Sequence, residues 1–380
     1  MNRARTYLDW NASAPLLPEA RAAMLAALDV VGNPSSVHGE GRAARGIIED
    51  AREQVARLVG ARPQEVVFTS GATEANNAVI WSGRDAIFAA AIEHDSVLAP
   101  IAVAGARHGT IAVGADGVVR AEGLDEPFAA VLASTTRALV SLQFANNETG
   151  AVQPVAEVAA LARTYGLRVH SDATQAVGRV AVDFVSLGLD YLSLSSHKLG
   201  GPKGAGALIV RDGAPLVPLI AGGGQERRQR AGTENLAAIA GFGAAARVAL
   251  AGLDGYARVA KLRDQLEGEV VRATPHAVII AADAPRLANT SCIALPRRAA
   301  ETLVAALDLS GIAVSAGAAC SSGKVAQSHV LTAMGLAPDI ARSAIRISMG
   351  PTTTDNDIAA FLAAWKHITR SVAGAHTRAA

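Results

Sequence analysis

Short apolar runs rich in β-branched residues alternate along the chain with longer alanine-rich segments, in which apolar positions recur at helical spacing. One such helical segment covers residues 156–166, between two of the apolar runs. Strands separated by helices pair most simply in parallel, with the helices crossing over the faces of the sheet. The pattern therefore predicts an α/β fold with a mainly parallel sheet covered on both faces, and strands at 65–70, 86–90, 139–146, 167–173, 191–196 and 206–210.

The pattern changes after a long helical stretch near residues 236–270. Three further apolar runs follow it, HAVIIA at 276–281, SCIALP at 291–296 and SAIRISMG at 343–350. Such runs, mixed with helical segments, are typical of an α+β unit. We therefore expect a second, smaller domain that begins near residue 250.

Composition and charge narrow the classes of function. The chain has 380 residues, of which 50% are hydrophobic and 18% charged, and its formal net charge is +1. Without a strong net charge or a basic and aromatic stretch, we expect neither nucleic-acid nor membrane binding. The nine histidines form no HExxH motif or Cys/His cluster, so no metal site is expected. Chemistry on small molecules is the better expectation.

The chain has two cysteines, Cys292 and Cys320, too few and too far apart for a disulfide framework. The N-terminus lacks the apolar core of a signal peptide, and no run of about 18 apolar residues could span a membrane. These features predict a cytoplasmic protein.

Ligands of open parallel sheets bind beyond the carboxyl ends of the strands, and several of these ends carry unusual residues. The turn TSGAT, at residues 69–73, leads into a helix and could offer backbone N–H groups of Gly71, Ala72 and Thr73 to a phosphate. A simple helix cap is the alternative. Asp172 lies at the end of the predicted strand at 167–173, where it could meet a positive group or cap a following helix.

Lys198 ends the run LSLSSHK, which otherwise reads as a buried strand. Burying an ammonium group is unfavourable unless it is paired or has lost its charge. Lys198 is therefore either a surface residue or a residue that takes part in chemistry. A phosphate turn, a buried acid and a lysine at one edge of a sheet are the parts that pyridoxal 5′-phosphate needs. The lysine forms the Schiff base and the acid faces the pyridine nitrogen.

With these parts assembled, the chain resembles the class V aminotransferase family of fold-type-I pyridoxal-phosphate enzymes, and within it the cysteine desulfurases of the NifS/IscS type. The resemblance covers nearly the whole length, and its specificity lies in the order and spacing of many motifs. They are YLDWNASAP (7–15), GNPSSVHGEGR (32–42), VVFTSGATEANN (66–77), EHDSVL (93–98), NNETGAVQP (146–154), HSDATQAVG (170–178), SSHKLGGPKGAGAL (195–208), RAGTEN (230–235), SAGAACSSG (315–323) and AIRISMG (344–350).

The resemblance implies a large domain at 16–249 with a seven-stranded sheet, and a small domain built from 1–15 and 250–380. In such an enzyme Lys198 holds the cofactor and moves a proton at the substrate. Asp172 faces the pyridine nitrogen, Gln175 the phenolic oxygen, and His94 stacks on the ring. The phosphate is bound by Ala72, Thr73, Ser195 and His197, and also by Thr233 of the neighbouring subunit, which implies a homodimer.

The same resemblance gives roles to the substrate-binding residues. Asn147 lies near the substrate and the cofactor oxygen. Arg346, in the apolar run AIRIS, binds the carboxylate of L-cysteine as a bidentate fork, although a structural ion pair is the plainer interpretation.

Cys320 lies among small and polar residues, whereas Cys292 lies in an apolar run and is interpreted as an inert core cysteine. In the desulfurase interpretation Cys320 takes sulfur as a persulfide, leaves L-alanine and passes the sulfur to an acceptor such as an Fe–S scaffold or a tRNA-thiolation protein. A selenocysteine lyase, an aminotransferase of the same family, or a catalytically idle scaffold are the alternatives.

Overall fold

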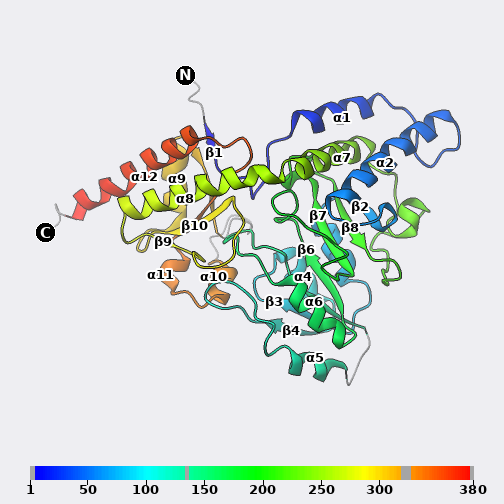
Figure 1. Cartoon of the computed structure of the whole chain (residues 1–380), viewed down its shortest axis with the longest axis horizontal. Coiled ribbons are helices and arrows are strands. Elements are labelled where there is room, and N and C mark those ends of the chain that lie inside the picture. Colours follow the sequence, from blue (N-terminus) through cyan, green and yellow to red (C-terminus); the bar gives the residue numbers. More distant parts are fainter. Residues whose placement is uncertain (1–4, 133–136, 318–326, 377–380) are drawn as a thin grey trace.

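The computed structural model describes residues 5–132, 137–317 and 327–376. At its centre lies a seven-stranded sheet (Figure 1). All of its strands run parallel except β8, which is antiparallel to both neighbours. The spatial order is β2 (Val66–Thr69), β8 (Gly206–Val210), β7 (Tyr191–Ser195), β6 (Arg168–Asp172), β5 (Ala138–Ser141), β3 (Ala86–Ala90) and β4 (Arg107–Ile111).

Helices cover both faces of this sheet, because alternate side chains of each strand point to opposite sides. In β2, Val66 and Phe68 join one apolar cluster, while Val67 joins the other. The first cluster includes α2 (Gly39–Leu58), α6 (Val155–Thr164) and α7 (Leu236–Ala251), and the second includes α3 (Ala72–Ile80) and α4 (Asp95–Val103). The fold class predicted from the sequence is therefore confirmed.

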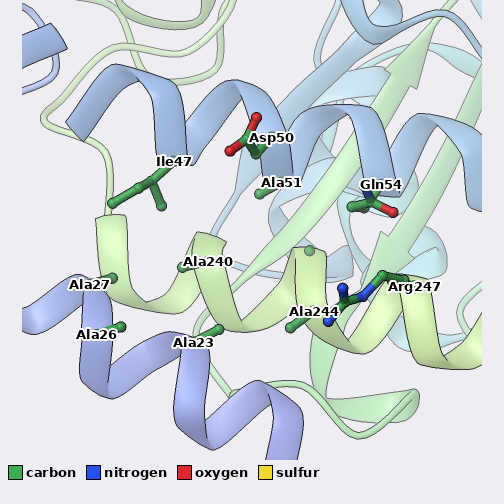
Figure 2. Close-up of a pocket in the computed structure, with 11 residues that line it drawn as sticks. Ala23, Ala26, Ala27, Ile47, Asp50, Ala51, Gln54, Ala240, Ala244 and Arg247 are labelled. Carbon is green, nitrogen blue, oxygen red and sulfur yellow. The ribbon is translucent and has the colours of Figure 1, made fainter. Parts of the chain in front are cut away.

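A groove of about 420 Å³ lies where α1 (Pro18–Leu28), α2 and α7 meet (Figure 2). The helices pack very closely here, since a Cβ added at Gly243 of α7 would lie 2.6 Å from the Cα of Ala51 in α2. Alanines make up most of the groove wall, with Asp50, Gln54 and Arg247 among them. The groove holds none of the residues that the sequence analysis selected for chemistry.

The second unit has its own apolar cluster, centred on the fully buried Trp365 and Phe361. Its four-stranded sheet has the order β12 (Ser315–Ala316), β13 (Ala344–Ser348), β10 (Thr290–Ala294) and β9 (Val278–Ile279), and β1 (Thr6–Tyr7) pairs separately with β11 (Ile312–Ala313). Its helices are α8 (Tyr256–Ala273), α9 (Ala300–Leu309), α10 (His329–Ala333), α11 (Pro338–Ala341) and α12 (Asp355–His376).

Two predicted elements differ from the structure, and one strand of the structure was not predicted. The run at 139–146 pairs as a strand only over Ala138–Ser141. The edge strand β4 was not predicted, because its sequence RHGTI is mostly exposed and carries no apolar run. The predicted long helix near 236–270 is two helices, α7 and α8, that are bent by 59° around Gly252 and Gly255.

That bend falls beside the predicted domain boundary, and the division at 249 and 250 stays a prediction. Within the described ranges no single helix is long and apolar enough to cross a membrane, and α7 and α8 reach such a length only when counted together across the bend.

Candidate active site

A cavity of about 720 Å³ lies at the carboxyl ends of β6 and β7 and beside the N-terminus of α3. Its volume is in the usual range for small-molecule sites. Side chains far apart in the sequence meet here, including ten of the residues selected above: Ala72, Thr73, His94, Asn147, Asp172, Gln175, Ser195, His197, Lys198 and Arg346. Thr233 does not line it, and Cys320 lies outside the described residues.

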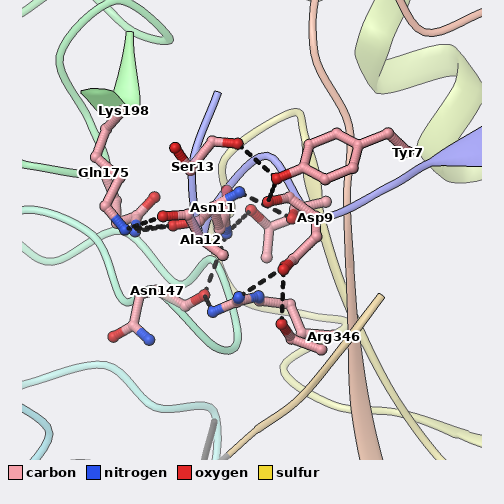
Figure 3. A network of polar contacts seen from close by, with 12 residues as sticks. Tyr7, Asp9, Asn11, Ala12, Ser13, Asn147, Gln175, Lys198 and Arg346 are labelled. Carbon is pink, nitrogen blue, oxygen red and sulfur yellow. Dashed lines mark hydrogen bonds and ion pairs between the residues drawn. The ribbon is translucent and has the colours of Figure 1, made fainter. Parts of the chain in front are cut away.

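Lys198 enters the cavity from a short 3₁₀ turn, Ser196–Lys198, that follows β7 directly. Its Nζ donates hydrogen bonds to the carbonyl oxygens of Asn11, at 2.6 Å, and Ala12, at 3.0 Å (Figure 3). Both of these acceptors are neutral, so the amino group is held in place without a carboxylate at those two positions.

The segment that supplies these carbonyls, residues 9–13, crosses from the second unit to the cavity (Figure 3). Asn11 is completely buried, and its hydrogen bonds hold the segment against β10 and β13. Its backbone N–H donates to Ser348 Oγ at 2.9 Å, and its side-chain amide donates to Thr290 Oγ1 at 2.9 Å. Sequence reasoning gave Asn11 no role, because the groups that reach Lys198 are backbone carbonyls, which no side-chain pattern marks.

Asp172 ends β6 and is nearly buried. Its Oδ1 accepts the backbone N–H of Thr174 at 2.9 Å, and its Oδ2 accepts an amide N–H of Asn76 at 2.7 Å. A turn, and not a helix, follows at residues 174–176, so the alternative interpretation of Asp172 as a helix cap is wrong. The carboxylate is instead an oriented acceptor on the cavity wall.

The phosphate turn begins α3 with Gly71 as its N-cap and with no side-chain capping bond. The first N–H groups of a helix have no partner inside the helix, and the helix dipole favours an anion beside them. The turn is also packed tightly on the sheet: a Cβ added at Gly206 of β8 would lie 2.6 Å from the Cα of Gly71. A phosphate fits this end of the cavity.

His197 is affected by the charges of two lysines. Burial is the main cause that lowers the pKa of His197, to about 4, and the charges of Lys198 and Lys203 lower it further. The imidazole is therefore neutral at pH 7, and its Nδ1 lies 3.3 Å from Ser13 Oγ. A neutral imidazole can donate one hydrogen bond to an anion such as a phosphate.

Arg346 projects from β13 of the second unit into the cavity. Its guanidinium donates to Asp9 Oδ1 at 2.9 Å and to the carbonyl oxygen of Asn147 at 3.1 Å (Figure 3). The ion pair of the plainer interpretation is thus present. The side chain is also nearly buried, and its Nε has no partner among the described residues. Binding of a substrate carboxylate stays a prediction.

Two curated relatives match almost the whole chain. A cysteine desulfurase of Cereibacter sphaeroides is 44% identical over 93% of both chains, and an IscS-like cysteine desulfurase of Mycobacterium tuberculosis is 41% identical over 94% of both. The solved structure of a NifS-like protein from Rickettsia africae has a TM-score of 0.87 at 37% identity, covering 96% of this chain and 99% of the other. The family model described as aminotransferase class V matches residues 6–361.

The chain belongs to the class V aminotransferase family. Its cofactor is pyridoxal 5′-phosphate, as the sequence predicted. The cavity has the groups for this cofactor: the Lys198 amino group, the Asp172 carboxylate and the N-terminus of α3, where the N-cap Gly71 makes no side-chain capping bond. Thr174, which also lines the cavity, has a buried hydroxyl without a partner in the described part of the chain.

Glu93, next to His94, is a fully buried acid that the sequence analysis missed. Its Oε1 accepts the backbone N–H of Gln143 at 2.5 Å, while its Oε2 has no partner within the described ranges. Burial, with a smaller contribution from the charge of Asp172, raises the pKa of Glu93 to about 8. The side chain is therefore a neutral carboxylic acid at pH 7.

The unfolding free energy of Glu93→Gln is expected to increase relative to that of the wild type as the pH rises. A raised pKa means that the folded protein holds a proton that the unfolded chain has released, so the unfolding free energy of the wild type falls from about pH 4.5 to about pH 8. Glutamine has no such titration. Between pH 6 and pH 8 the difference should grow by about 2 kcal/mol.

Denaturant unfolding of both proteins at pH 6 and pH 8 measures this change, and Glu122→Gln, at an exposed acid, is the matched control. An unchanged difference between Glu93→Gln and wild type at the two pH values would show that Glu93 is ionised when buried.

Proposed function

We propose that the protein is a cysteine desulfurase that converts L-cysteine to L-alanine and holds the released sulfur as a persulfide on Cys320. The observation that carries this proposal is the meeting of Lys198, Asp172 and Arg346 in one cavity of a chain whose curated relatives are named cysteine desulfurases. Three elements from two structural units supply these side chains, so the cavity is built by the whole fold.

The cofactor supplies an electron sink for the charge that develops on the substrate carbon. Around it, the Asp172 carboxylate holds a proton on the ring nitrogen, and the N-terminal turn of α3, with Ser195 and His197, binds the phosphate. Gln175 donates to the phenolic oxygen and His94 covers the face of the ring. Thr233, on an exposed segment beside a hollow of about 190 Å³, serves the phosphate of the partner in a homodimer.

Arg346 binds the carboxylate of the substrate beside Asn147, and Lys198 takes the proton from the substrate Cα. The Cys320 thiolate then attacks the substrate sulfur. An S–S bond forms and the Cβ–S bond breaks. Its electron pair stays on Cβ, which takes up one proton, and Cα regains the proton that left it, so that the product is alanine. No external oxidant is needed. The persulfide then passes to a cytoplasmic acceptor protein, such as an Fe–S scaffold or a tRNA-thiolation protein.

Product analysis tests this proposal against its alternatives. Purified protein is incubated with L-cysteine and a thiol reductant, and sulfide, alanine and 2-oxo acids are quantified. Sulfide and alanine in a 1:1 ratio are expected. A 2-oxo acid would indicate an aminotransferase, reaction with L-selenocysteine alone would indicate a lyase, and no product from a yellow protein would indicate an idle scaffold or a need for an activating partner.

A further inference from the structure

Asn76 is a completely buried amide on α3 that neither the sequence analysis nor the proposed chemistry uses. It lies four residues after Ala72 and three after Thr73, so it follows the phosphate turn by one turn of the same helix. The helix thus ties the position of Asn76 to that of the turn.

Both donors of this amide are used. Nδ2 donates to Asp172 Oδ2 at 2.7 Å and to Ser96 Oγ at 2.8 Å. The opposite orientation of the amide would bring Oδ1 against the Asp172 carboxylate, acceptor against acceptor. Oδ1 has no partner among the described residues. The side chain of Asn76 is therefore held in the structure by its two donated hydrogen bonds.

The second bond continues to His94. The Ser96 hydroxyl accepts from Asn76, so its own proton is available to His94 Nδ1, which lies 2.8 Å away. The backbone N–H of Ser96 also donates to this nitrogen, at 3.0 Å, where His94 caps α4. With two donors directed at Nδ1, the ring proton of the neutral imidazole resides on Nε2.

We infer that Asn76 is a positioning residue that holds the Asp172 carboxylate directly, and the His94 ring through Ser96, in register with the phosphate-binding turn of α3. The inference rests on the proposed cofactor roles of Asp172 and His94. A rigid cofactor bound at its phosphate, its ring nitrogen and its ring face needs these three anchors at fixed separations, and a site held by locked neighbours is more accurate than one held by mobile side chains.

Asn76→Asp tests the first bond with little change in shape. It sets two carboxylates within hydrogen-bond distance of each other, so Asp172 must share a proton or move away from its position. We expect the dissociation constant for pyridoxal 5′-phosphate to rise at least tenfold, with a shifted visible absorption band of the bound cofactor.

Asn77→Asp is the matched control. Asn77 is the next residue of the same helix, but its amide donates to the backbone carbonyls of Thr73 and Ser96, and its replacement should change cofactor affinity less than threefold. Equal affinities of the two variants would overturn the role of Asn76 and leave the proposed function intact. Failure of the wild type and of Asn77→Asp to bind the cofactor through Lys198 would instead contradict the proposed site.

Nitrogen NMR of the full-length wild-type holoenzyme, labelled with ¹⁵N-histidine, tests the second bond even if Asn76→Asp does not fold. The His94 signals are assigned by their loss in His94→Asn. Protonated Nε2 and unprotonated Nδ1 are expected, and Ser96→Ala should shift the Nδ1 signal. A protonated Nδ1 in the wild type, or an Nδ1 signal unmoved by Ser96→Ala, would contradict the link from Asn76 to His94.

Discussion

Lys198→Ala is expected to lower the rate of desulfuration at least a thousandfold and to remove the covalent bond between protein and cofactor. Proton transfer by a positioned group contributes roughly a hundredfold to ten-thousandfold to a rate, and this variant loses that contribution together with the covalent attachment. Folding should be little affected, because the two hydrogen bonds lost from Nζ end on backbone carbonyls that face the cavity.

Reduction with borohydride followed by peptide mass spectrometry measures the covalent bond. In the wild type the cofactor should be found on Lys198. Lys203 is the appropriate control, because it is the other lysine on the wall of the same cavity, and Lys203→Ala should keep the reducible bond. A reducible bond at another lysine in Lys198→Ala would refute the assignment.

Arg346→Lys is expected to raise the KM for L-cysteine by roughly ten- to a hundredfold, with a much smaller change in kcat. Hydrogen bonds to charged groups contribute about 1.5–3 kcal/mol, and lysine cannot form the two-pronged pair that a guanidinium makes with a carboxylate. Lysine keeps a positive charge beside the partly buried Asp9, so this acid keeps a positive partner.

Arg286→Lys controls for the general effect of replacing a buried arginine. Arg286 forms a two-pronged pair with Glu267, at 2.7 and 2.9 Å, away from the cavity. Both variants are expected to lose some stability, but only Arg346→Lys should change KM. Equal KM values for the two variants would mean that Arg346 is a structural ion pair and that the substrate carboxylate binds elsewhere.

The sequence predicted the sheet and the centre of the site for one physical reason. The carboxyl ends of parallel strands meet at one edge, so Asp172, at the end of β6, and Lys198, in the turn directly after the neighbouring β7, had to lie close together. The position of Arg346 was less predictable, because its strand belongs to a different sheet. Resemblance, and not periodicity, assigned it to the same site.

The missed features share a different cause. Asn11 contributes its backbone carbonyl group, which no sequence pattern indicates. Asn76 contributes a side-chain amide from inside a helix, where no sequence motif distinguishes a functional asparagine. Both act through contacts between segments about 100 or more residues apart, since Asn76 bonds to Asp172 and the carbonyl of Asn11 bonds to Lys198. The bend between α7 and α8 was missed because apolar positions recur at helical spacing on both sides of it.

The most direct test of the central claim is to find where the sulfur goes after a single turnover. Cys292 is completely buried in β10, and burial raises the pKa of its thiol, so it remains a protonated and inaccessible group. The protein is mixed with ³⁵S-labelled L-cysteine without reductant, digested, and its labelled peptides are identified. Label is expected on the peptide of Cys320, and it should be lost in Cys320→Ala with the bound cofactor retained. Label on Cys292, or label that persists in Cys320→Ala, would contradict it.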